Sequence, residues 1–151
     1  MSFRVVHYIN QFFANIGGEE MAHIAPELRE GKVGPGMAFE QQWKGEAVIV
    51  NTIICGDSYF AEHEKEAKEQ VLNWVKEIKP DLFIAGPAFN AGRYGYACAN
   101  IALEVQTELG IPVSTTRILS FMSAPGFSLY IPVRTGMPSS AWTSRAMLEQ
   151  A

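Results

Sequence analysis

The chain has 151 residues, 48% of them hydrophobic, and a formal net charge of -4 at pH 7. This length and composition fit one domain with an ordinary core. The 12 basic residues are scattered, so the clustered positive charge that nucleic-acid binding requires is missing. No apolar run approaches the roughly 20 residues that span a bilayer, and the first residues lack the layout of a secretory signal. We therefore expect a cytoplasmic protein with neither nucleic acid nor a membrane as partner.

Strand-like and helix-like stretches alternate in the first part of the chain. Residues 4–9 and 47–54 are nearly continuous apolar runs, which are typical of strands covered on both faces. Residues 12–36 between them have no regular period, and we interpret them as a long loop. A functional loop and a peripheral excursion over one end of the sheet are equally compatible with this segment. A short helix is expected over residues 37–43.

Helical periodicity returns after the second strand. Apolar residues recur at helical spacing over residues 61–79, and Asp57 or Ser58 is expected to cap this helix. A third strand over residues 82–85 then leads through a glycine-rich loop into a helix over residues 94–109. The order of elements is therefore strand, helix, strand, helix.

A fourth strand is expected over residues 111–115. Strands that alternate with helices predict an α/β fold in three layers, α/β/α, with a mostly parallel, flavodoxin- or Rossmann-like sheet of about four strands. We assign residues 1–116 to this domain. Residues 117–151 show no clear period and are expected to form an irregular tail.

Polar residues and glycines follow the predicted strands. The carboxyl ends of parallel strands meet at one edge of a sheet, where open α/β folds bind ligands, although turns at any such edge have a similar composition. Glycines let the backbone approach a ligand closely, and Arg93 could bind an anion or pair with a nearby carboxylate. The candidate substrate- or partner-binding residues are Asn10, Gln11, Gly17, Gly18, Cys55, Gly56, Asp57, Gly86, Pro87, Asn90, Gly92, Arg93 and Tyr94.

The two cysteines, Cys55 and Cys98, have no metal-ligand spacing, and a disulfide is not expected in a reducing compartment. Cys98 lies on an apolar helical stripe and is interpreted as a core residue. Cys55, at a strand end, is a candidate for a reactive thiol, while the catalytic residues otherwise stay unknown. His7 is interpreted as a packed core histidine. The sequence contains no HExxH, CxxC, GxGxxG or P-loop motif, so no metal or nucleotide site is expected.

Several short segments together carry a family resemblance. They are YINQFF (8–13), IGGEE (16–20), GPG (34–36), ICGD (54–57) and GPAFNAGRYG (86–95). In this combination they resemble the N-terminal part of the selenoprotein B subunit of glycine, sarcosine and betaine reductases. The resemblance covers about residues 3–116.

The resemblance implies a component of an amino-acid reductase that cleaves the C–N bond of glycine or an N-methylated glycine reductively. It also implies a small amino-acid substrate and partner subunits, namely a pyruvoyl-bearing subunit and a small selenoprotein. The selenocysteine of the family lies in a later segment that these 151 residues lack, and neither Cys55 nor Cys98 matches it. We therefore expect no cofactor in this chain and no activity of the chain alone. The alternative is a non-catalytic module that binds small carboxylates or docks subunits.

The tail departs from the family pattern. After Thr116 the family would continue with a turn similar to Glu-Asn-Pro-Gly, whereas RILS (117–120) follows here. A truncated subunit, a diverged homologue kept for binding and a change of reading frame near Arg117 all fit this departure. The aromatic residues of the tail would leave apolar surface in need of a partner, which is consistent with a homo-oligomer.

Overall fold

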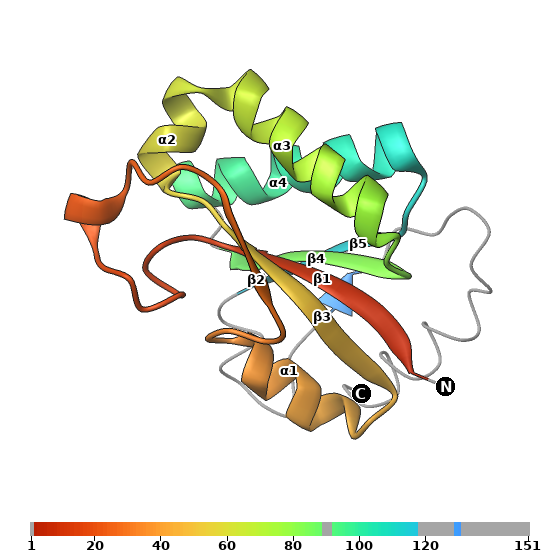
Figure 1. The fold of residues 1–151 in the computed structure, drawn as a ribbon. Helices are drawn as coiled ribbons and strands as arrows, with labels where there is room; N and C mark the ends of the chain where they lie inside the picture. The colour runs from red at the N-terminus through yellow and green to blue at the C-terminus, as the bar shows by residue number, and fades with distance from the viewer. Residues whose placement is uncertain (1, 89–91, 118–128, 131–151) are drawn as a thin grey trace.

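The computed structural model describes residues 2–88, 92–117 and 129–130. They form one sheet with helices on both faces (Figure 1). The strands occur in the order β2-β3-β1-β4-β5-β6. Their bounds are β1 Phe3–Ile9, β2 Glu27–Glu30, β3 Ala47–Ile54, β4 Leu82–Ala88, β5 Val113–Arg117 and β6 Leu129–Tyr130.

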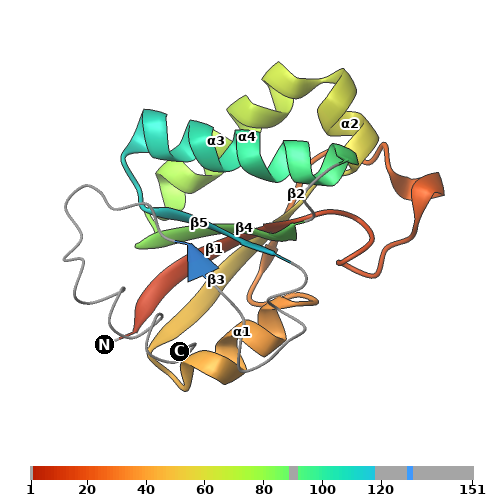
Figure 2. The same ribbon diagram turned by 180° about the vertical axis from the view of Figure 1, so that it is seen from behind.

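The four central strands, β3, β1, β4 and β5, pair in parallel, whereas β2 and β6 pair antiparallel at the two edges. Helix α1 (Gly36–Trp43) covers one face, and α2 (Asp57–Glu62), α3 (Glu64–Ile78) and α4 (Gly92–Leu109) cover the other, as the two opposite views show (Figures 1 and 2). The predicted three-layer α/β fold with about four parallel strands is therefore confirmed.

Burial on both faces explains why the strands are nearly continuous apolar runs. On β1, Val6 and Tyr8 pack into the core under α2, α3 and α4, while Val5 packs into the core against α1. Side chains alternate between the faces of a strand, so a strand between two helical layers needs apolar residues at successive positions. On α3, the buried residues Ala67, Val71 and Val75 recur every four positions and form its inner face.

His7 lies in the core, as interpreted from the sequence. Its Nε2 donates to the carbonyl oxygen of Gly86 at 2.5 Å, and its ring contacts Phe39 of α1 edge-on, with 5.2 Å between ring centroids. Burial lowers the pKa of His7 to about 4, so the imidazole is neutral at pH 7. His7 therefore ties β1 to the end of β4 and lies outside the candidate pocket described below.

The structure differs from several sequence predictions. The predicted helix over 61–79 is divided between two helices, because His63 between α2 and α3 is not helical. The cap prediction is wrong: Gly56 is the N-cap residue of α2, without a side-chain cap bond. The segment 12–36 contains the short 3-10 helix η1 (Glu19–Met21) and the edge strand β2, which pairs with β3.

Little of the predicted tail falls within the described residues. They include Arg117, at the end of β5, and the two residues of β6, which pair antiparallel with Thr115 and Thr116. The rest of the tail lies outside the described residues. In the described ranges, no helix is both long enough and apolar enough to cross a membrane.

Candidate functional site

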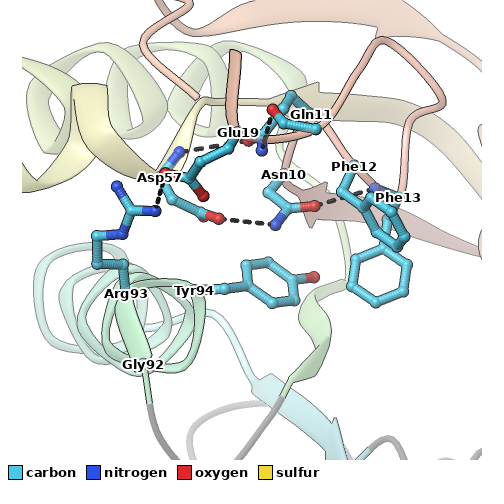
Figure 3. Close-up of a pocket in the computed structure, with 10 residues that line it drawn as sticks. Asn10, Gln11, Phe12, Phe13, Glu19, Asp57, Gly92, Arg93 and Tyr94 are labelled. Carbon is cyan, nitrogen blue, oxygen red and sulfur yellow. Dashed lines mark hydrogen bonds and ion pairs between the residues drawn. The ribbon is translucent and has the colours of Figure 1, made fainter. Parts of the chain in front are cut away.

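A pocket of about 290 Å³ lies at the carboxyl ends of β1, β3 and β4 (Figure 3). In the sheet, β1 lies between β3 and β4, so the chain order reverses at this point. Open α/β sheets bind ligands in the crevice at such a switch point. The pocket is lined by Asn10, Gln11, Phe12, Phe13, Gly18, Glu19, Asp57, Gly92, Arg93 and Tyr94.

A buried pair, Asn10 and Asp57, joins the ends of two strands. The Asn10 amide nitrogen donates to Asp57 Oδ2 at 2.9 Å, and its amide oxygen accepts from the backbone N–H of Phe13 at 3.0 Å. Asn10 is 5% and Asp57 8% exposed. Asn10 follows β1, and Asp57 begins α2 after β3. The Asn10 side chain therefore links the end of β1 to the start of α2 and to the segment that follows β1.

Gln11 fastens the next part of that segment. Its amide nitrogen donates to the carbonyl oxygen of Gly18 at 3.2 Å, and its amide oxygen accepts from the N–H of Asp57 at 3.4 Å. Its backbone carbonyl accepts from the N–H of Ile16 at 3.0 Å. These bonds hold the turn that contains Gly17 and Gly18 next to the start of α2.

Gly56 allows the segment 12–36 to lie against the start of α2. The N–H of Gly56 donates to the carbonyl of Ile24 at 3.1 Å, and that of Ser58 donates to the carbonyl of Ala22 at 2.7 Å. A Cβ atom on Gly56 would come within 2.2 Å of the Ala22 oxygen. Glycine is therefore required here by close approach of two backbones, since its φ of -69° suits any residue.

Arg93 pairs with a carboxylate. Its Nη2 lies 2.5 Å from Glu19 Oε1, and its Nη1 donates to Ser58 Oγ. The bond to Glu19 raises the pKa of the guanidinium above its ordinary value. Of the two interpretations of Arg93, pairing with a nearby carboxylate is thus the one present in this structure, although Arg93 also lines the pocket.

Aromatic side chains form one wall of the pocket. Tyr94 is buried and packs against Phe13, with 5.4 Å between ring centroids. Phe12 contacts Phe13 edge-on and is 62% exposed. Phe12, Phe13 and Glu19 were not among the predicted site residues, although all three belong to the motifs that carry the family resemblance.

The charge of Asp57 is only partly compensated. Burial raises the pKa of its carboxyl above the ordinary value, while the bond from Asn10 and the charge of Arg93 lower it. Oδ2 accepts from Asn10, whereas Oδ1 is buried and has no hydrogen-bond partner among the described residues. The pocket wall therefore contains a carboxylate oxygen with unused acceptor capacity.

The two cysteines lie in the core, outside the pocket lining. Burial raises the pKa of Cys55 to about 12 and that of Cys98 still higher. Because the thiolate is the reactive form of cysteine, this environment does not favour Cys55 as a nucleophile. No group of three or more His, Cys, Asp or Glu that could hold a metal ion occurs within the described ranges.

The remaining predicted site residues are divided. Seven of them line the pocket: Asn10, Gln11, Gly18, Asp57, Gly92, Arg93 and Tyr94. Gly17, Cys55 and Gly56 directly precede lining residues in the sequence. Gly86 and Pro87 belong to β4, and the Gly86 carbonyl faces His7 instead. Asn90 lies outside the described residues.

The fold and the pocket define an α/β domain with a ligand-type crevice at the switch point of its sheet. The sequence model of the family described as glycine/sarcosine/betaine reductase selenoprotein B matches residues 2–145. The chain belongs to this family. The match extends beyond residue 116, the limit of the resemblance recognised in the sequence motifs, and so includes most of the tail.

Curated relatives of the chain are named as component B subunits of the same reductases. The chain is 56% identical over 128 residues to the glycine reductase complex component B subunit gamma of Carboxydothermus hydrogenoformans, covering 85% of this chain and 29% of the relative. It is 53% identical over 127 residues to the sarcosine reductase complex component B subunit beta of Peptoclostridium acidaminophilum, covering 84% and 28%. The betaine reductase complex component B subunit beta of the same organism is 39% identical over 113 residues, covering 75% and 26%. The chain thus spans under a third of these relatives. No solved structure matches it.

The close approach at Gly56 leads to a stability prediction. Gly56→Ala should lower the free energy of unfolding by about 3 kcal/mol, because the added methyl group overlaps the Ala22 carbonyl. Gly45→Ala is the matched control: Gly45 has a φ of +87° but open space around its Cβ position, so only about 1 kcal/mol should be lost. Urea denaturation of both variants measures the difference. Equal losses would contradict the close-approach argument.

Proposed function

We propose that this chain is the N-terminal domain of a component B subunit of a glycine, sarcosine or betaine reductase, and that its pocket binds the small amino acid. The intact enzyme would cleave the C–N bond reductively. Membership of the family and the names of the relatives support the enzyme class. The observation that carries the role of this domain is the pocket at the switch point, where a buried carboxylate and a basic side chain face one small volume.

The described residues of the pocket bind and orient a ligand in this proposal. The selenocysteine expected for the family would supply redox chemistry from outside these 151 residues, and a pyruvoyl group would come from a partner subunit. No thiol lines the pocket, and both cysteines are buried with raised pKa values, so neither fits the place of a selenol. The relatives are named as components of complexes, which supports other subunits as partners. Self-association and a cytoplasmic location stay predictions.

A second candidate function rests on Arg93. The first turn of the 18-residue helix α4 and the Arg93 guanidinium both line the pocket, and both favour an anion. The domain could thus bind a small carboxylate, or a carboxylate of another subunit, without taking part in catalysis. Arg93 would then exchange Glu19 for the incoming group.

The reductase proposal predicts that the purified chain turns over neither glycine, sarcosine nor betaine, even with the partner components of the complex present. The physical reason is that the described residues that line the pocket include no redox-active group. The measurement is product formation over time, with an intact component B as positive control. Turnover by the 151-residue chain would refute the assignment of the redox centre to another segment.

The anion-binding candidate predicts that Glu19→Gln strengthens acetate binding about two- to fivefold, because Arg93 loses its charged partner and Glu19 is exposed. Arg93→Ala should abolish the gain when combined with Glu19→Gln. Glu77→Gln on α3, far from the pocket lining, is the matched control and should change nothing. Calorimetric titration measures all four proteins. An unchanged acetate affinity in Glu19→Gln would remove Arg93 from carboxylate binding.

A further inference from the structure

The unpartnered oxygen of Asp57 indicates which chemical group completes the pocket. Asp57 is 8% exposed and lines the cavity, and its Oδ1 has no hydrogen-bond partner among the described residues. A buried carboxylate oxygen without a donor is costly, and the cost is removed when a ligand supplies an N–H. Arg93, the cationic residue in the described pocket lining, is already bonded to Glu19 and Ser58. The missing donor is therefore best supplied by an ammonium group.

The start of α4, which also lines the pocket, suits a negative group. Figure 3 shows Asp57 beside Asn10, with Arg93 and Tyr94 extending toward them from the first turn of α4. The first turn of a helix carries partial positive charge, and α4 has 18 residues. A ligand that presents an ammonium group to Asp57 and a carboxylate to the start of α4 would match both charges. Small zwitterionic amino acids have this arrangement.

We propose that Asp57 Oδ1 accepts a hydrogen bond from the ammonium group of a small zwitterionic amino acid that carries at least one N–H, and that the pocket thereby selects against quaternary ammonium ligands. The inference rests on the proposed function, since it assigns the ligand of the same pocket. Glycine and sarcosine have N–H donors at pH 7, whereas the nitrogen of betaine carries three methyl groups and no hydrogen. Betaine would leave Oδ1 buried and unpaired.

The aromatic residues do not reverse this preference. Quaternary ammonium ions are bound by aromatic cages, in which several ring faces surround the cation. Here Phe13 and Tyr94 pack against each other at 5.4 Å and Phe12 meets Phe13 edge-on, so the described rings form one wall. The comparisons point the same way, because the glycine and sarcosine reductase relatives are 56% and 53% identical and the betaine reductase relative is 39% identical.

The test is calorimetric titration of the 151-residue chain with glycine, sarcosine and betaine at neutral pH. Glycine and sarcosine should bind, and betaine should bind at least about tenfold more weakly, the effect of one unsatisfied buried acceptor. Asp57→Asn keeps the size of the side chain but removes its charge and one of its two oxygens. If the remaining oxygen accepts from Asn10, an NH2 donor replaces Oδ1, so glycine binding should weaken by about tenfold or more. Glu62→Gln, an exposed residue of the same helix outside the pocket, is the matched control and should leave glycine binding unchanged.

The possible outcomes separate this inference from the proposed function. Equal or tighter binding of betaine to the unaltered chain would overturn it without any need for a variant. Glycine affinity that is unchanged in a folded Asp57→Asn protein, checked by circular dichroism, would also overturn it and leave the proposed function standing. If no amino acid binds the unaltered chain, the inference fails together with the substrate-binding role, while subunit docking is unaffected.

Discussion

The hydrogen bond from Asn10 to Asp57 is the interaction on which the arrangement of the pocket depends. The two residues follow β1 and β3, neighbouring parallel strands whose last paired residues are Ile9 and Ile54. Because the strands end side by side, a single amide can reach the carboxylate and also accept the N–H of Phe13. The core sets the positions of the strand ends, and this bond holds together two residues that line the pocket.

The position of the segment between β1 and α1 depends on the same strand ends. Gln11 continues the connection to Asp57 and Gly18, while Gly56 lets the backbone near Ala22 lie directly against the start of α2. The segment then contributes Glu19, which lines the pocket and pairs with Arg93. The sequence left a functional loop and a peripheral excursion equally open for this segment; in the structure part of it lines the candidate pocket, and backbone hydrogen bonds hold it against α2.

Sequence reasoning was sufficient where burial sets a strong local pattern. The parallel strands are continuous apolar runs because helices cover both faces. The polar residues that follow them, including Asn10, Gln11, Asp57 and Arg93, meet because the carboxyl ends of parallel strands lie at the same edge of the sheet.

Other features depend on partners distant in sequence. The strand β2 is a polar Glu-Leu-Arg-Glu run that forms by pairing with β3, and Arg93 finds Glu19, 74 residues away. Asp57 was expected to cap a helix, but Asn10 binds its side chain. Cys55 was a candidate reactive thiol at a strand end, yet its side chain is buried in the core with residues of α2, α3 and α4.

The charge of the pocket links the fold to the proposed chemistry. A carboxylate that is buried and half-satisfied persists because Asn10 and Arg93 offset part of its desolvation, which leaves one oxygen for a ligand. The most direct measurement of this account is a double-mutant cycle of Asn10→Ala and Asp57→Ala, followed by urea denaturation. Since hydrogen bonds to charged groups contribute about 1.5–3 kcal/mol, we predict a coupling energy in that range between the two positions. A coupling energy near zero would contradict the view that this bond organises the pocket.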